Sequence, residues 1–167
     1  MSARVAQLLL MLFAAALLAG CAVRLAPDYD VALLNGITET NTAALKLFAD
    51  VETGSDATEF PDYRDDYATA IAAFEGLRLR ADARPIPPLA DRISKMPFLS
   101  SVCDPAQAPA QCLNATGNAL KEVVDVLRTM RDRHRTQGLS PDAVQLLRGR
   151  YDQEIHQALT VETALDR

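Results

Sequence analysis

The sequence predicts an all-α fold, a four-helix bundle made of two antiparallel helix pairs. Apolar residues recur at alternating spacings of three and four over four segments, which is typical of helices with one buried face. Short loops join the first segment to the second and the third to the fourth, so each pair is expected to lie antiparallel. The chain also lacks the strict apolar and polar alternation of half-buried strands.

The first helix is expected over about 28–53, with Pro27 and Asp28 as its start signal. Gly36 weakens the early part, so the regular portion is expected to begin near Thr38, and Gly54 ends the helix. One stripe contains Leu34, Ile37, Asn41, Ala44, Phe48 and Val51. Asn41 is its polar position, and a polar side chain in a helical seam can specify the register of the helices.

The second helix is expected over about 59–84. Pro61 suits the first helical turn, and Pro85 ends the helix because a residue before proline avoids helical geometry. The stripe contains Phe60, Tyr63, Tyr67, Ala70, Phe74, Leu77 and Ala81. We expect the rings of Tyr63 and Tyr67 to pack in the core while their hydroxyls reach outward.

The pattern fails from Pro85 to Gly117, and this proline-rich connection allows only a short helix within 89–96. The connection is long enough either to cross over the bundle or to fold back on itself. The third helix is expected over about 114–137, with a stripe of Leu120, Val123, Leu127, Met130 and His134. The fourth is expected over about 141–165, with Ser140 as its N-cap and with Gly149 weakening its interior.

The N-terminus has the pattern of a secretion signal. Arg4 is followed by an apolar run from Val5 to Leu18, which is shorter than the roughly 20 residues that span a membrane. The residues Leu18-Ala19-Gly20-Cys21 resemble the lipobox of bacterial lipoprotein precursors. The alternative is an ordinary secretory signal that happens to be followed by a cysteine.

The lipobox resemblance implies cleavage before Cys21, a diacylglyceryl group on the Cys21 thiol and a further acyl chain such as palmitate on the new amino group. Residues 1–20 are then a lipoprotein signal peptide, 21–27 a lipidated tether and 28–167 the helical domain. Two or more acyl chains anchor a protein stably. Ala22, where an aspartate would imply retention at the inner membrane, implies the periplasmic leaflet of the outer membrane.

Loss of residues 1–20 leaves 16 basic and 22 acidic residues, a formal net charge of −6. An acidic surface opposes binding to nucleic acid and to anionic lipid, so no nucleic-acid partner is expected. Cys103 and Cys112 remain as an even pair in an oxidising compartment and are expected to form a disulfide. Closing this short loop stabilises by roughly 2.5 to 3 kcal/mol. A redox or metal role for the pair is the disfavoured alternative.

His134 is the most suggestive residue for chemistry, because an imidazole in a bundle core can bind a haem or a metal. Met130, one turn earlier, Met96 and His156 are the histidine or methionine candidates for a second haem ligand. The competing interpretation is that His134 complements the helix dipole and bonds the terminal carbonyls. His156, off the apolar stripe and one turn after Asp152, is expected to be solvated. Neither histidine follows a Glu at the spacing of di-iron bundles, so no metal is expected.

Two groups of arginines lie near helix ends, where they suit the helix dipole or offer a surface to an anionic partner: Arg128, Arg131, Arg133 and Arg135, and Arg78, Arg80 and Arg84. The chain lacks the motifs of serine hydrolases, zinc proteases and phosphate-binding loops, so the sequence does not predict an enzyme. It predicts a lipid-anchored envelope protein, a scaffold or protein-binding bundle facing the periplasm, without a cofactor. The alternative is a carrier of a small ligand or haem, which requires a cavity at His134.

Overall fold

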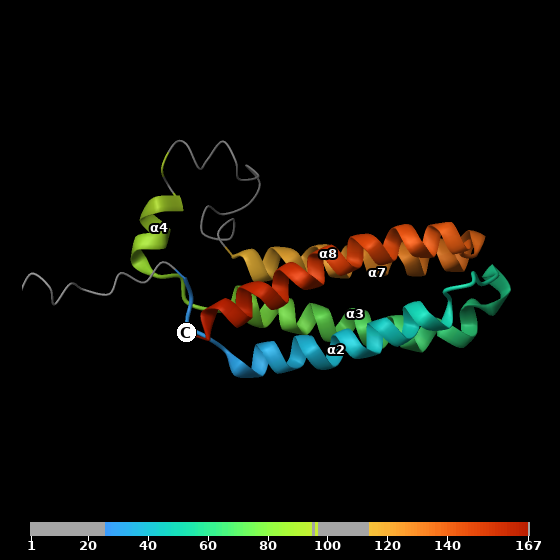
Figure 1. Ribbon diagram of the computed structural model, residues 1–167, viewed down its shortest axis with the longest axis horizontal. Helices are drawn as coiled ribbons and strands as arrows, with labels where there is room; N and C mark the ends of the chain where they lie inside the picture. Colours follow the sequence, from blue (N-terminus) through green and yellow to red (C-terminus); the bar gives the residue numbers. More distant parts are fainter. Residues whose placement is uncertain (1–25, 95, 97–113, 167) are drawn as a thin grey trace, which may run out of the picture.

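Four long helices dominate the structure, which is a computed structural model that describes residues 26–94, 96 and 114–166. They are α2 (Val31–Asp50), α3 (Phe60–Asp82), α7 (Ala115–Gln137) and α8 (Pro141–Leu165), shown in Figure 1. A 3-10 turn, η1 (Ala57–Glu59), leads into α3, and a short helix, α4 (Pro88–Ser94), follows it. The predicted all-α fold is confirmed.

Side-chain caps fix where three of these helices begin. The Asp30 carboxylate accepts hydrogen bonds from the amides of Ala32 and Leu33 at 3.0 and 3.1 Å, so α2 starts at Val31 and not near Asp28 as the sequence predicted. Asn114 caps α7 by accepting from the Gly117 amide at 3.1 Å, and Ser140 caps α8 through the Ala143 amide. Each cap satisfies amides that have no partner inside the helix.

The helices run alternately up and down, and one hairpin of α2 and α3 lies beside another of α7 and α8 (Figure 1). α7 packs extensively against both α8 and α3, whereas α2 and α8 contact each other less. The start of α2, the end of α3, the start of α7 and the end of α8 share one end of the bundle, which we call the terminal end. The opposite end, with the loops 51–56 and 138–140, is the loop end.

The connection between α3 and α7 leaves and returns at the terminal end. The Asn114 amide nitrogen donates to the Asp82 carboxylate at 2.9 Å, which joins the start of α7 to the end of α3. A Cβ on Gly117 would collide with an Asp82 carboxylate oxygen, so glycine permits this close approach. Because α3 ends and α7 begins at the same end of the bundle, the connection does not cross over to the opposite end, which decides between the two paths that the sequence left open. We call this connection, residues 83–114, the excursion.

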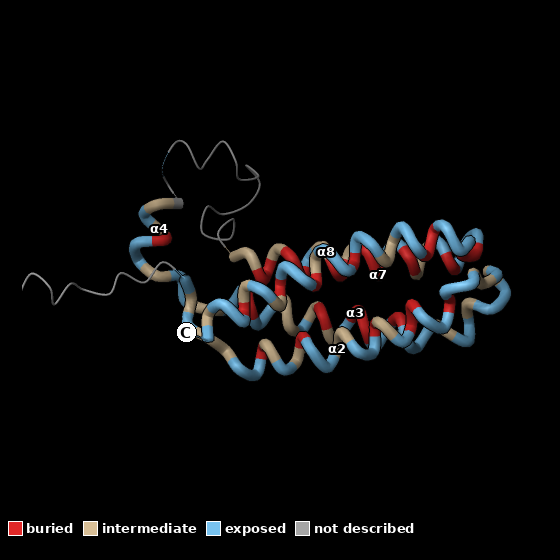
Figure 2. Tube along the Cα trace, viewed as in Figure 1, coloured by how far each residue is buried: buried red, intermediate tan, exposed pale blue. Residues whose placement is uncertain are grey.

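One hydrophobic core lies between the four helices, whose buried faces point inward in Figure 2. Aromatic rings join the two hairpins, because the ring of Tyr151 from α8 lies 5.1 Å from Phe48 of α2 and 6.2 Å from Phe74 of α3. Such pairs stabilise beyond the area that they bury. In the described part of the chain, no helix is both long and apolar enough to cross a bilayer.

Gly36 does not shorten α2, contrary to the sequence prediction. The helix is regular through this position, and a Cβ on Gly36 would lie 2.6 Å from a terminal methyl of Leu77 in α3. Glycine here lets α3 pack closely against α2. The weak helical propensity of glycine is therefore outweighed by tertiary contact, which decides most helix stability in folded proteins.

Two glycines hold the loop end together. Gly54 and Gly138 have φ values of 94° and 76°, which L side chains rarely adopt. Between them, Ser55 and Leu139 exchange both backbone hydrogen bonds, at 2.9 and 2.7 Å. A Cβ on Gly54 would lie 2.8 Å from the Leu139 oxygen, and one on Gly138 would lie 2.8 Å from the Ser55 oxygen. The two interhelical loops therefore depend on both glycines to pair.

Candidate functional sites at the two ends of the bundle

His134 lies at the centre of a hydrogen-bonded chain at the loop end. It is fully buried on α7, and the rings of Phe60, Tyr63 and Tyr67 lie 5.3–5.9 Å from its own. Its Nδ1 is 3.2 Å from the Tyr67 hydroxyl of α3, and its Nε2 is 3.0 Å from the Ser55 hydroxyl. The network joins α3, α7 and the loop before η1.

The partners assign the proton positions along this chain. Ser55 donates its single hydroxyl proton to the Glu59 carboxylate at 2.6 Å, so its oxygen accepts from His134 Nε2. His134 Nδ1 then accepts the proton of Tyr67, whose pKa burial raises. Burial lowers the pKa of His134 and keeps the ring neutral, although Asp56 and Glu59 oppose this shift. The donors therefore run in one direction, from Tyr67 to Glu59.

This direction restricts the chemistry available. A serine nucleophile needs a base that takes its proton, whereas here His134 donates to Ser55 and the serine proton lies on Glu59. The hydrogen bond from Ser55 also lowers the pKa of Glu59, which keeps that carboxylate ionised. The hydrogen-bonded chain from Tyr67 through His134 and Ser55 to Glu59, which we call the clasp, therefore joins structural elements and does not activate the Ser55 hydroxyl.

The same hydrogen bonds oppose a role for His134 and Met130 as haem or metal ligands. Both side chains are fully buried, and both ring nitrogens of His134 are engaged. An axial ligand would have to break one of these hydrogen bonds. The structure corrects two sequence predictions, because Tyr67 turns its hydroxyl inward to His134 and His134 bonds two side chains instead of the terminal carbonyls of α7.

At the terminal end, an ion pair is buried between three helices. Arg84, just beyond α3, donates to both oxygens of Glu162 in α8, at 2.7 and 3.0 Å. The Glu162 side chain is fully buried and Arg84 is 9% exposed, so Arg84 is not the solvated dipole partner that the sequence suggested. Thr116 of α7 donates to Glu162 at 2.5 Å. The Arg84 Nε is buried and has no hydrogen-bond partner among the described residues.

Sequence reasoning missed Glu162 and Ser55. Glu162 follows Ala158 by four residues, so it continues the apolar stripe of α8 at helical spacing, and Thr116 occupies the stripe of α7. Polar residues at stripe positions of two neighbouring helices could have signalled a buried pair. Ser55 carried no comparable signal, because its contact with His134 depends on how the two loops pair.

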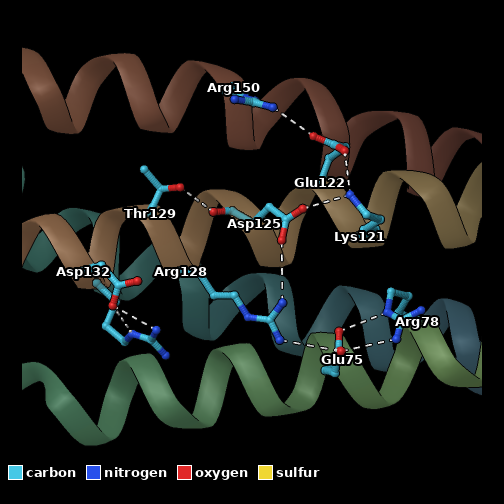
Figure 3. A network of polar contacts seen from close by, with 10 residues as sticks. Glu75, Arg78, Lys121, Glu122, Asp125, Arg128, Thr129, Asp132 and Arg150 are labelled. Atoms are coloured by element: carbon cyan, nitrogen blue, oxygen red, sulfur yellow. Dashed lines mark hydrogen bonds and ion pairs between the residues drawn. The ribbon is translucent and has the colours of Figure 1, made fainter. Parts of the chain in front are cut away.

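The arginines of α7 are mostly neutralised within the bundle. Arg128 lies 3.7 Å from Glu75 of α3 and 3.6 Å from Asp125, and Arg131 and Arg135 both reach Asp132. Figure 3 shows a ladder of ion pairs that runs from Glu75 of α3 through Arg128, Asp125, Lys121 and Glu122 of α7 to Arg150 of α8, with the Asp132 pair apart from it. The ladder ties α3, α7 and α8 together on one face. Arg133, the remaining arginine of this predicted group, is exposed and makes no ion pair with a described residue, so it alone of the four stays available to an anionic partner.

Two other polar residues have simple roles. The Tyr151 hydroxyl donates to Asn41 Oδ1 at 2.8 Å, so Asn41 links α2 to α8, in agreement with its expected position in the seam. His156 is exposed, as predicted, although the neighbouring Asp152 pairs with Arg148 at 2.8 Å. Among the described residues, no three His, Cys, Asp or Glu side chains come together in a way that could hold a metal ion.

An open cleft of about 450 Å³ lies at the loop end, between the end of α2 and the start of α8. It is lined by Phe48, Ala49, Glu52, Pro141, Asp142, Val144, Gln145 and Arg148. The Arg148 guanidinium lies 5.4 Å from the centre of the Phe48 ring, which is cation–π geometry, and is also neutralised by Asp152. The cleft lining includes the acidic residues Glu52 and Asp142, and the sequence from 50 to 66 is acidic, with Asp50, Glu52, Asp56, Glu59, Asp62, Asp65 and Asp66 against Arg64.

The predicted lipidation site Cys21 and the predicted disulfide partners Cys103 and Cys112 lie outside the described residues. Comparison of the chain with protein-family models, with curated proteins and with solved structures found no match.

Proposed function

We propose that the protein is a lipid-anchored cell-envelope protein whose helical bundle is a non-catalytic scaffold for another envelope protein. The main support is that the tether joins the bundle at one end, whereas the cleft lies at the opposite end. The tether that follows the lipobox enters α2 at the terminal end, so an acyl anchor on Cys21 holds that end near the membrane. The 23 residues of α3 place the loop end about 35 Å farther out.

The tether limits how far the terminal end can stand from the membrane. Residues 22–30 lie between the lipidated cysteine and α2 and extend to at most about 30 Å. Ala22 after the lipobox favours the periplasmic leaflet of the outer membrane, which directs the loop end into the periplasm. The cleft between α2 and α8 is then the surface most accessible to a partner.

Substitution of Cys21 tests the anchor. We expect Cys21→Ala, made behind an ordinary cleavable secretory signal so that the apolar run of residues 5–18 is still removed, to move the protein from the membrane fraction to the soluble fraction, because the acylated thiol is lost. Cys103→Ala is the matched control and is expected to stay with the membrane. A Cys21→Ala protein that remains membrane-bound after a high-salt wash contradicts lipid anchoring.

Site-specific photocrosslinking tests the scaffold role in intact cells. Gln145 lines the cleft, whereas Gln153 is a second exposed glutamine farther along α8. A photoreactive amino acid at 145 is expected to capture one envelope protein, and the same group at 153 is not. The crosslink at 145 is further expected to weaken when Glu52 and Asp142 are changed to lysine. Equal capture from both positions, or no capture from 145, argues against the cleft as the binding surface.

A further inference from the structure

The exposed apolar side chains of this protein are concentrated at the terminal end. Among the described residues, the large hydrophobic side chains that are exposed are Val31, Leu79, Ile86, Leu89, Met96 and Leu146. Only Leu146, on α8, lies near the loop end. Single exposed apolar residues are ordinary on a protein surface, but their accumulation on one part of it marks a contact surface.

Three successive parts of the chain contribute to this accumulation. Val31 is the first residue of α2 and is 56% exposed, and Leu79 lies in the last turn of α3. Ile86, Leu89 and Met96 follow on the excursion that contains α4, which projects beyond the terminal end in Figure 1. The hydrophobic core draws on no described residue between Ala81 and Ala119, so Ile86, Leu89 and Met96 do not belong to it.

The charges beside these side chains are largely compensated. Arg80 pairs with Asp30 through two hydrogen bonds at 2.6 and 2.9 Å, and Arg78 pairs with Asp82 at 2.6 Å. Arg84 is buried against Glu162. A surface that combines apolar side chains with paired charges suits an apolar partner without strong net charge.

We propose that the terminal end of the bundle rests directly on the lipid surface, with Val31, Ile86 and Leu89 in the interfacial region of the bilayer. This rests on the proposed lipid anchoring. The position of the tether favours lipid as the occupant, because only the nine residues 22–30 separate the lipobox cysteine from Val31. Acyl chains on Cys21 therefore bring this end within reach of the membrane, where contact of apolar side chains adds to the anchor.

Tryptophan fluorescence tests this contact, since the protein contains no tryptophan. Val31→Trp, Leu89→Trp and the control Leu146→Trp each place a single reporter at an exposed apolar position. The lipidated full-length mature proteins are reconstituted into vesicles of phosphatidylcholine, with and without bromine on the acyl chains. We expect the reporters at 31 and 89 to emit at shorter wavelength and to be quenched several times more by brominated lipid than the reporter at 146.

The outcomes separate this inference from the anchoring proposal. If the proteins float with the vesicles but positions 31 and 89 are quenched no more than 146, the anchor stands and the lipid contact is refuted. A shift to shorter wavelength without quenching means that protein covers the terminal end, which also refutes it. Equal quenching at all three positions indicates a bundle that lies flat on the membrane and overturns the end-on contact. Proteins that do not float contradict both proposals.

Discussion

At the scale of single residues, the most consequential feature is the burial of Arg84 against Glu162. Removing one member of a buried ion pair leaves the other charge uncompensated, which typically costs about 3–5 kcal/mol. We expect Arg84→Ala to lower the free energy of unfolding by about this amount in a urea titration. Arg80→Ala is the matched control, because Arg80 is 52% exposed and its pair with Asp30 is expected to contribute about 1 kcal/mol or less.

A double substitution separates the charge effect from the loss of packing. Arg84→Met combined with Glu162→Leu removes both charges and keeps much of the buried volume. Replacing a whole buried pair by apolar residues is often neutral or stabilising. The double variant is therefore expected to be more stable than Arg84→Ala. Equal urea midpoints for Arg84→Ala and Arg80→Ala would count against a special role for the buried pair.

A second prediction at the scale of single residues concerns the pH dependence of stability that His134 causes. Burial lowers its pKa below the ordinary value of 6.5, so the unfolded chain binds a proton at higher pH than the folded protein does. Stability is then expected to fall as the pH drops below about 6.5, and to level off once the folded state is protonated as well. The hydrogen-bonded carboxylates Asp30 and Glu75 have lowered pKa values, so their contributions are lost only at more acidic pH.

Urea midpoints measured between about pH 7 and pH 5 isolate the histidine effect from that of the carboxylates. His134→Gln is expected to lose the pH dependence in this range, in addition to a lower overall stability. His156→Gln removes the other, exposed histidine and is expected to keep the dependence. An unchanged slope in His134→Gln would show that the buried imidazole is not its source.

At the scale of the elements, local signals in the sequence placed the helices well. The last two were expected over about 114–137 and 141–165, and α7 and α8 span Ala115–Gln137 and Pro141–Leu165. Ser140, Pro141 and Gly138 supply those boundaries through local geometry alone. The start of α2 was missed because two aspartates precede it, and only the structure shows that Asp30 caps the helix. Gly36 was misjudged because its packing partner lies on another helix.

The glycines give a prediction about the elements. Gly76 and Gly149 lie inside α3 and α8, and a Cβ at either position meets nothing within 4 Å. Alanine at either site is expected to stabilise by up to about 1 kcal/mol through helix propensity. Gly138→Ala is expected to destabilise, because it combines a φ of 76° with a contact of 2.8 Å to the Ser55 oxygen. Thermal unfolding of the three variants measures these effects, and a destabilising Gly149→Ala would contradict this view of α8.

At the scale of the whole molecule, the sequence predicted four helices but not how their ends meet. The contacts of His134 with Tyr67 and Ser55 and the Arg84–Glu162 pair join residues 67 to 79 positions apart, and such contacts depend on the relative rotation of the helices. Periodicity placed His134 on the buried face of α7, but it carries no information about which hydroxyls it meets. The path of the proline-rich connection could not be predicted either, because its length permitted both a crossover and a folded-back route.

The closeness of Asp82 and Asn114 leads to a prediction about the whole bundle. Because α3 ends beside the start of α7 and the core draws on no described residue between Ala81 and Ala119, the excursion is expected to be dispensable for folding. A chain in which a flexible linker of about six residues replaces residues 86–112 loses α4 but should keep its four long helices, because helix–helix connections of this length are common. Each halving of a loop also removes about 0.6 kcal/mol of closure entropy, which favours a slightly higher urea midpoint.

This shortened chain also separates folding from membrane contact. It retains Val31 but loses Ile86 and Leu89, so a Val31→Trp reporter in lipidated protein is expected to be less quenched by brominated lipid than in the full chain. Circular dichroism and urea titration establish that the bundle is intact before the comparison is made. A shortened chain that unfolds would mean that the excursion supports the bundle itself. Unchanged quenching at position 31 would mean that α2 and the tether make the lipid contact without the excursion.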